Sequence, residues 1–300
     1  MKKIAILERT NFSGRQMQEL KAHFIVDTFD NLSQEEANKI APAYDVVIVN
    51  WLDPTPFLLK MKKGSLVALL STGYGWITNL KEAHDKGVFV ANIPGYSTEA
   101  VAEHLLALLL GITKNIFPTL NKQDNHSVGV ELSGKTIGII GLGNIGYRFA
   151  EICNFFGANV ITYNRHQKNT PLAQDVSLDE LLKKSDIICV SCSVNESSKN
   201  LINSKNIASI KKGAILIGST WGIISEDALI SGIEKGNIGA IAFDAALEAN
   251  DEKIENLIGD KIYLTPHIAY NTEESEQRQL DICVENIISF INGNGKNIVN

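Results

Sequence analysis

The most informative segment of the sequence is Thr136-Ile137-Gly138-Ile139-Ile140-Gly141-Leu142-Gly143-Asn144-Ile145-Gly146. It begins as a β-rich apolar run, continues as G-x-G-x-x-G and leads into a helical stretch that ends near Phe156. This order of strand, glycine loop and helix is typical of a dinucleotide-binding βαβ unit. Gly141 allows the tight turn, Gly143 lets the backbone approach a pyrophosphate, and Gly146 lets the helix pack closely on the strand.

The helix that follows the loop supplies hydrogen-bond donors. Asn144 and Ile145 lie in its first turn, where the helix dipole is positive, so we expect their free N–H groups to face the phosphates. The alternative is a tight turn whose glycines serve packing alone, and a bare G-x-G-x-x-G does not exclude it. The position of the motif between a strand and a helix favours dinucleotide binding.

The end of the next expected strand bears on the choice between NAD and NADP. In the NAD pattern an acidic residue there binds the ribose 2′-hydroxyl, whereas this chain reads Tyr163-Asn164-Arg165-His166. Asn164 removes the charge that repels a 2′-phosphate, and Arg165 is able to pair with one. An arginine after a strand is equally an ordinary solvated residue. The sequence predicts NAD or NADP, with a lean towards NADP.

Short apolar runs recur along the chain and alternate with helical-looking stretches. The expected strands are Lys3–Leu7, Val46–Val49, Val67–Leu70 and Val88–Val90, then Thr136–Ile140, Asn159–Thr162, Asp186–Val190, Ala214–Ile217, Ile238–Phe243 and Lys261–Leu264. Strands that alternate with helices form right-handed βαβ units and a parallel sheet that is covered on both faces. Two series of strands predict an α/β protein with two doubly wound parallel-sheet domains.

A turn-forming break at Asn92–Tyr96 marks the expected domain boundary. The helix after it runs to about Thr113 and is apolar over nearly its whole surface, so it must be buried against something large, and a domain interface or a subunit interface would serve. The last helix, from Glu273 to about Ile291, is expected to return to the first domain, because that domain is small and its two segments flank the second one. The expected domains are a split substrate domain at residues 1–95 and 274–300, and a dinucleotide-binding domain at residues 96–273.

Composition excludes several classes of protein. Hydrophobic residues make up 44% of the chain and charged residues 21%, which suits sizeable cores and excludes general disorder. A net charge of −6, from 28 basic and 34 acidic residues, leaves no basic field for a nucleic-acid backbone. The apolar run at the start is too short for a signal peptide, and Leu105 to Ile112 is too short to cross a bilayer. We expect a cytoplasmic protein without a membrane or nucleic-acid partner.

Four cysteines in 300 residues do not make a disulfide framework. Cys189 and Cys192 have redox spacing, but they fall at the end of a buried strand, where residues three apart point to opposite faces. Redox and metal sites need a helix start or further ligands. We therefore interpret both as core cysteines and expect no metal site.

Further motifs follow one another along almost the whole chain. They are Ser71-Thr72-Gly73-Tyr74-Gly75, Asn92-Ile93-Pro94-Gly95-Tyr96-Ser97-Thr98-Glu99-Ala100-Val101-Ala102-Glu103-His104, Leu132-Ser133-Gly134-Lys135 before the glycine loop, and Leu264-Thr265-Pro266-His267-Ile268-Ala269. In this order they resemble the signatures of the D-isomer-specific 2-hydroxyacid dehydrogenases. The resemblance implies a Rossmann-type cofactor domain inserted in a flavodoxin-like substrate domain, and a homodimer through the helix after Asn92. It also implies hydride transfer between the nicotinamide and C2 of a small 2-oxo or 2-hydroxy acid.

The resemblance assigns roles to single residues. His267 becomes the acid that gives a proton to the substrate oxygen, a task that suits a group with a pKa near neutrality. Thr220 and Asp244 are placed near the nicotinamide carboxamide. The backbone of Tyr74 and Gly75 is placed near an anionic group of the substrate.

Two catalytic positions depart from the family pattern. Trp221 stands where the family has an arginine, and an indole has one N–H donor and no charge, so it cannot grip a carboxylate with two bonds. Packing and substrate stacking are both open roles for Trp221. The family's glutamate falls at Ala249, and Glu248 lies one position early. Either a loop adjustment brings Glu248 to His267, or Glu248 is a surface acid.

Two functional hypotheses follow from these residues. The first is an NAD(P)-dependent dehydrogenase or reductase acting on CH–OH donors, whose altered site predicts a substrate other than a simple 2-oxo acid, or slow turnover on one. The second is a catalytically degenerate dinucleotide-binding protein that acts as a sensor or an assembly partner. A structural dimer without dinucleotide fits poorly with the intact glycine loop. The residues do not name the substrate.

Overall fold

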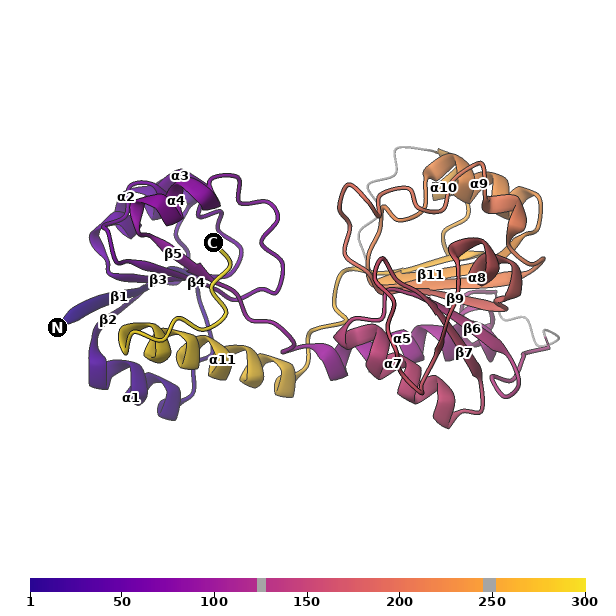
Figure 1. The fold of residues 1–300 in the computed structure, drawn as a ribbon, viewed down its shortest axis with the longest axis horizontal. Coiled ribbons are helices and arrows are strands. Elements are labelled where there is room, and N and C mark those ends of the chain that lie inside the picture. Colours follow the sequence, from indigo (N-terminus) through magenta and orange to yellow (C-terminus); the bar gives the residue numbers. More distant parts are fainter. Residues whose placement is uncertain (123–127, 245–251) are drawn as a thin grey trace. The chain divides into compact units, whose positions relative to one another are not determined.

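The chain forms two compact units in the computed structural model, which describes residues 1–122, 128–244 and 252–300. The first unit comprises Met1–Ser97 and Thr272–Asn300, and the second comprises Thr98–Asn271. The second unit is therefore inserted in the first. Each unit holds one parallel sheet with helices on both faces (Figure 1).

The first unit is built on a five-stranded sheet in the order β2-β1-β3-β4-β5. Its strands are β1 (Lys2–Ile6), β2 (Phe24–Thr28), β3 (Val46–Val49), β4 (Leu66–Leu69) and β5 (Phe89–Ala91). The central strands β3 and β4 are buried at every position, as expected of apolar runs with helices on both sides. The strand order reverses between β1 and β3, which is the flavodoxin-like arrangement.

Helices cover both faces of this sheet (Figure 1). One face carries α1 (Gly14–His23) and α11 (Glu273–Ile291), which pack on each other, and the other carries α2 (Gln34–Ile40), α3 (Thr55–Leu58) and α4 (Leu80–Lys86). Capping boxes start α1 and α2, because the Ser13 and Ser33 hydroxyls accept from the amides of Gln16 and Glu36. The last helix thus joins the unit formed by the start of the chain.

The second unit is built on a seven-stranded sheet in the order β12-β11-β10-β9-β6-β7-β8. Its strands are β6 (Thr136–Ile140), β7 (Asn159–Tyr163), β8 (Gln174–Asp175), β9 (Ile187–Val190), β10 (Ala214–Gly218), β11 (Ile238–Asp244) and β12 (Ile262–Thr265). All of the described pairings are parallel. The order reverses between β6 and β9, as in a Rossmann-type fold. The predicted fold class is confirmed for both units.

Helices again form a layer on each face of this sheet (Figure 1). The helices are α5 (Thr98–Thr113) and α7 (Asn144–Phe155) on one face, and α8 (Leu178–Lys184), α9 (Glu226–Glu234) and α10 (Glu252–Glu255) on the other, with α6 (Ile116–Lys122) after α5. The apolar helix α5 packs mainly on its own unit, against α7, β10 and β11. Leu105 and Leu109 are fully buried there, whereas Leu106 and Leu110 are only partly buried.

Two strands were not expected from the sequence. The edge strand β2 has one buried residue, Phe24, among exposed and half-buried ones, so it lacks the continuous apolar run that marks the inner strands. The other, β8, has two residues. Both lie at the edge of their sheet, where one neighbouring strand suffices and burial is slight.

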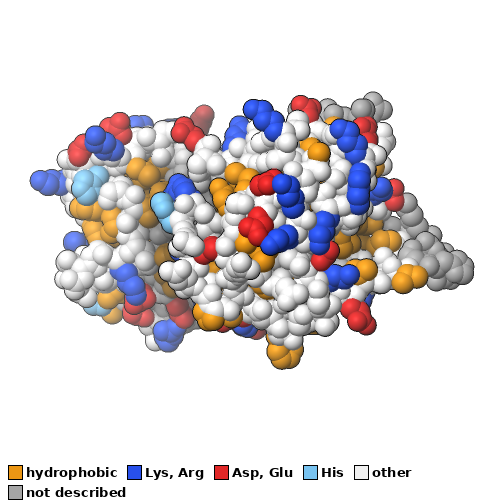
Figure 2. All heavy atoms as spheres, turned by 45° about the vertical axis from the view of Figure 1, so that its right-hand side comes forward, with side chains coloured by type: hydrophobic (Ala, Val, Ile, Leu, Met, Phe, Trp, Pro, Cys, Tyr) orange, Lys and Arg blue, Asp and Glu red, His pale blue; other side chains and the backbone are white. Residues whose placement is uncertain are grey.

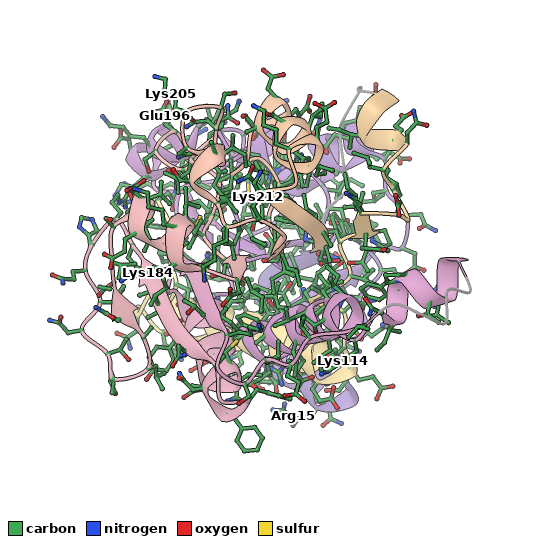
Figure 3. The ribbon with its side chains drawn as sticks, turned by 90° about the vertical axis from the view of Figure 1, so that its right-hand side faces the viewer. Arg15, Lys114, Lys184, Glu196, Lys205 and Lys212 are labelled. Atoms are coloured by element: carbon green, nitrogen blue, oxygen red, sulfur yellow. The ribbon has the colours of Figure 1, made fainter. Side chains whose placement is uncertain are left out.

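The surface mixes charges of both signs. Figure 2 shows one face, on which Lys and Arg side chains are interspersed with Asp and Glu side chains, as on an ordinary solvated surface. Glu196 and Lys205 lie on the long connection between β9 and β10, at the periphery in Figure 3. Over residues 1–122, 128–244 and 252–300, no helix is both long and apolar enough to span a membrane.

Candidate dinucleotide and catalytic site

Most of the predicted site residues lie at one edge of the seven-stranded sheet, in loops, at a strand end or in the first turn of α7. Because the strands are parallel, the connections that leave β6, β7, β9, β10 and β12 all start at the carboxyl edge. The glycine loop follows β6, and the strand order reverses beside it. In open α/β sheets, ligands bind at this edge and at this reversal.

The glycine loop has the shape that a pyrophosphate needs. Gly141 has a φ of +95°, and a Cβ there would lie 2.6 Å from the Cys192 Cβ. A Cβ on Gly146 would lie 2.2 Å from the Gly141 carbonyl oxygen, so this contact admits only glycine. At Gly143, in contrast, a Cβ would meet no protein atom within 4 Å. Protein atoms therefore pack tightly against the loop at Gly141 and Gly146, whereas the space beside Gly143 is free of protein atoms.

The start of α7 offers free donors to that open space. Gly143 is the N-cap residue and no side chain caps the helix, so the first-turn amides of Asn144 and Ile145 have no capping acceptor. Gly143 and Asn144 are exposed. An anion placed here meets backbone N–H groups at the positive end of a twelve-residue helix. These residues fit the pyrophosphate of a nicotinamide dinucleotide.

Asn164 supports the glycine loop from behind. Its Oδ1 accepts a hydrogen bond from the Leu142 amide at 2.6 Å. Its Nδ2 donates to Asp175 Oδ1 at 3.0 Å and to Thr162 Oγ1 at 3.1 Å. The neighbouring Arg165 is exposed. The side-chain amide that was expected at the ribose is thus engaged in fixing the loop, a role that sequence reasoning missed because Asp175 lies eleven residues further along the chain.

Cysteines at this edge are structural. Cys189 is fully buried on β9, and burial raises its pKa well above the ordinary value. Burial also raises the pKa of Cys192, whose backbone closes on Gly141. Cys189 is a core cysteine, as predicted, whereas Cys192 is only partly buried, so its interpretation as a core residue was wrong. Within the described residues, no group of three or more His, Cys, Asp or Glu side chains could hold a metal ion.

His267 is held in an unusual backbone conformation. Its φ of +54° is in the left-handed region, and the other non-glycine residues with positive φ in the described chain are asparagines. Such a conformation costs about 1–3 kcal/mol for a residue with a Cβ, so its surroundings must enforce it. The imidazole is exposed and lies perpendicular to the Tyr270 ring, with centroids 5.7 Å apart.

The Asp244 carboxylate binds the backbone of the two residues that follow His267. Its side chain is buried, and its carboxylate accepts from the Ile268 amide at 2.8 Å and the Ala269 amide at 2.7 Å. It also accepts from the Thr265 hydroxyl at 2.6 Å. The resemblance placed Asp244 beside the nicotinamide, and that role stays a prediction. The structure gives it a second task, because these bonds fix the turn that carries His267.

His104 completes this network and was missed as a functional residue. Its Nε2 lies 2.9 Å from Thr265 Oγ1 and 3.7 Å from Asp244 Oδ1. Burial lowers the pKa of His104 below its ordinary value, against the opposing effect of the Asp244 carboxylate. The signal in the sequence was a histidine within the apolar helix α5, but its partners lie more than 130 residues away.

Trp221 follows β10 at the same edge. The half-buried indole meets the Phe243 ring edge to face, with centroids 5.3 Å apart at 84°, so packing is one of its roles. Thr220 beside it is half-buried. Glu248 lies outside the described residues, and its expected contact with His267 stays a prediction.

Tyr74 and Gly75 belong to the first unit, in the loop after β4. Both are exposed, and a Cβ on Gly75 would meet nothing within 4 Å. Glu8, two residues after β1, was not predicted as a functional residue; its carboxylate accepts from the amides of Asn50 at 2.6 Å and Trp51 at 2.9 Å. This carboxylate presents the Trp51 side chain, which is 72% exposed.

The fold and the loop geometry define a dinucleotide-binding protein, and comparison with known proteins gives its family. Residues 106–269 match the family described as the D-isomer specific 2-hydroxyacid dehydrogenase, NAD binding domain. The chain belongs to the D-isomer-specific 2-hydroxyacid dehydrogenases, as the motifs predicted.

Curated relatives and solved structures agree with this assignment. The chain is 32% identical to a hydroxypyruvate reductase of Blautia hydrogenotrophica over 89% of its own length and 88% of the relative. It is also 32% identical to a hydroxypyruvate reductase of Thermotoga maritima, over 84% and 86%. An acyclic imino acid reductase (Bsp5), solved with NADPH and D-Arg, is 28% identical with a TM-score of 0.87, covering 99% of this chain and 100% of that one.

These matches decide between the two functional hypotheses. They support a nicotinamide-dependent oxidoreductase, and they give no support to the catalytically degenerate binding protein. The cofactor is a nicotinamide dinucleotide.

Proposed function

We propose that the protein uses NADPH to reduce the C=O group of a small 2-oxo acid, with His267 as the proton donor. The observation that carries this proposal is the turn at the end of β12. Hydrogen bonds to the buried Asp244 hold this turn, in which His267 has a left-handed backbone and an exposed imidazole. Strain of this kind persists where the surrounding structure enforces it, and it clusters at active sites. The turn leaves the same sheet edge as the glycine loop.

The residues divide the work as follows. The amides of Asn144 and Ile145, with the open backbone at Gly143, hold the pyrophosphate. When bound, the reduced nicotinamide supplies a hydride to the carbonyl carbon. His267 donates a proton to the carbonyl oxygen, so that C=O becomes CH–OH. Asp244 uses three of about four acceptor positions on the turn, which leaves one for an amide donor such as the carboxamide.

A substrate screen tests this function. Purified protein is mixed with NADPH or NADH and with hydroxypyruvate, glyoxylate or pyruvate, and absorbance of the reduced cofactor is followed. We expect oxidation of NADPH, and a loss of about a hundredfold or more in kcat for His267→Asn, since general acids contribute about 10²–10⁴-fold. Tight cofactor binding without turnover of any substrate would contradict the proposal. Absence of binding would contradict the assignment of the glycine loop as well.

A second candidate substrate class is favoured by Trp221. A protonated imine already carries the positive charge that an arginine would induce in a carbonyl, and an arginine would repel it. An indole face, in contrast, attracts a cation. The acyclic imino acid reductase to which this chain is similar acts, by its name, on imino acids. We therefore propose 2-imino acids as the alternative to 2-oxo acids.

Amines distinguish the two classes. Adding ammonium or methylamine to a 2-oxo acid forms imine in solution, so an imine reductase oxidises NADPH faster and yields an amino acid instead of a hydroxy acid. Trp221→Arg should then raise kcat/KM for the oxo acid and lower it for the imine, with Trp221→Phe as the control that keeps a ring against Phe243. If hydroxy acid is the only product and amine does not change the rate, the substrate is the 2-oxo acid and not the imine.

Three further expectations belong to the proposal. NADPH is preferred over NADH, because Arg165, His166 and Lys168 are exposed on the loop after β7, where a 2′-phosphate is expected. The protein forms a homodimer through the outer side of α5, on which the apolar Leu106 and Leu110 stay partly uncovered. It works in the cytoplasm.

A further inference from the structure

The hydrogen bonds around the His267 turn form a chain that starts on another element. Asp244 Oδ1 accepts from the Thr265 hydroxyl at 2.6 Å, and Thr265 Oγ1 lies 2.9 Å from His104 Nε2. A hydroxyl has one proton, and the Thr265 proton is committed to Asp244. The imidazole of His104 must therefore donate its Nε2–H to Thr265. The order is His104 to Thr265 to Asp244.

This chain crosses two layers of the second unit. His104 belongs to α5, Thr265 ends β12 and Asp244 ends the neighbouring strand β11. The His104 side chain is 19% exposed and the Asp244 side chain 1%, so water competes little for these bonds. Hydrogen bonds in such surroundings are stronger than in water, and an unpaired member is costly. Helix α5 is thereby tied to the strand ends by side chains as well as by packing.

We infer that His104 is a positioning residue for His267: it fixes Thr265 and Asp244, and these two side chains hold the turn on both sides of the catalytic imidazole. On one side, the Thr265 hydroxyl donates to Asp244, and the Thr265 backbone carbonyl accepts from the His267 amide at 2.9 Å. On the other side, Asp244 accepts from the amides of Ile268 and Ala269. The inference rests on the proposed role of His267.

The consequence concerns the orientation of the imidazole and not its chemistry. His267 is exposed, and its left-handed backbone is unfavourable by itself, so only its neighbours hold the ring in one place. If Thr265 loses the donor on His104, the hydroxyl is free to rotate and Asp244 loses its fixed partner. The turn then relaxes towards an ordinary backbone conformation. Misplacement of a catalytic group by about 1 Å can lower a rate about a hundredfold.

Variants at two positions test the chain. We expect His104→Leu and Thr265→Val each to lower kcat about ten- to hundredfold, with KM and the dissociation constant of NADPH changed less than about twofold. His104→Gln keeps an N–H donor and Thr265→Ser keeps the hydroxyl, so both should restore most of kcat. The double variant His104→Leu with Thr265→Val should be no slower than the slower single one, because both break the same chain. Glu103→Gln, an exposed neighbour on α5, serves as the control.

Hydrogen exchange provides a readout that needs no substrate. The amides of Ile268 and Ala269 donate to Asp244 and should exchange faster in His104→Leu than in wild type or His104→Gln, while the strand amides of β11 keep their protection. Unchanged exchange at both amides would overturn the inference, and so would equal losses of kcat in the Leu and Gln variants. If no substrate is turned over but the exchange follows this order, the proposed function fails and the positioning chain stands.

Discussion

Asn164 holds the backbone of the glycine loop, because its Oδ1 accepts the amide of Leu142 at 2.6 Å. Leu142 lies between the two glycines that shape the phosphate site, so this single bond fixes the loop where the dinucleotide is expected. The same side chain donates to the Asp175 carboxylate at 3.0 Å. Asn164 stands at the position expected to distinguish NAD from NADP, and it also holds the glycine loop in place.

Asn164→Asp should destabilise the protein although it restores the acidic residue of the NAD pattern. The new carboxylate loses the donor to Asp175 and places two like charges within hydrogen-bond distance. We expect a loss of about 1–2 kcal/mol in the free energy of unfolding, measured by urea denaturation. Asp175→Asn added to this variant supplies a donor again and should recover most of the loss. Equal stability of the wild type and Asn164→Asp would contradict the structural role.

Arg165→Gln tests the cofactor preference. A guanidinium that pairs with a 2′-phosphate contributes about 1.5–3 kcal/mol, so its loss should weaken NADPH binding about ten- to hundredfold. NADH lacks that phosphate and should bind as before. Fluorescence titration of both cofactors measures the difference. Lys184→Gln removes an exposed charge on α8 that pairs with Glu180, and is the control. Parallel losses for NADH and NADPH would argue against a phosphate contact at Arg165.

The sheet architecture could be predicted because buried parallel strands have a simple signature. Val46–Val49 is apolar throughout and buried throughout, and its predicted ends are those of β3. The strand β6 was found in the same way, with the glycine loop fixing its end. The edge strand β2 was missed because its outer position leaves most of its residues partly exposed.

The site was predictable in its residues and not in its contacts. The motif around His267 pointed to a catalytic turn. The bonds from the amides of Ile268 and Ala269 to Asp244, however, join positions more than twenty residues apart. The bond between His104 and Thr265 spans 161 positions. Spacing along the chain carries no information on such pairs, because they form only when α5 packs across the sheet. Asp244 was accordingly assigned to the cofactor alone.

Gly143 and Gly146 should respond to alanine in opposite ways. Gly143→Ala meets no protein atom within 4 Å and has a φ of −78°, so the free energy of unfolding should change by less than about 0.5 kcal/mol. Its methyl group fills the space beside the free amides, and we expect dinucleotide binding to weaken at least about tenfold. Gly146→Ala places its methyl group 2.2 Å from a carbonyl oxygen and should destabilise the fold itself. Thermal unfolding and cofactor titration of both variants separate the two effects. Normal NADPH binding by Gly143→Ala would show that the phosphates do not bind beside this loop.

His104 should make stability depend on pH. Burial lowers its pKa in the folded protein, with Asp244 as the charged group that faces it and opposes the shift. The unfolded chain keeps the ordinary histidine pKa of about 6.5 and so takes up a proton that the folded protein resists as the pH falls below that value. The contribution of neutral His104 is complete above about pH 6.5 and is lost progressively as the pH falls through the lowered pKa. His104→Gln has no such group, so urea denaturation at several pH values should show the wild type losing stability relative to the variant on acidification. Two curves that stay parallel between neutral and mildly acidic pH would show that the folded protein protonates His104 as readily as the unfolded chain does.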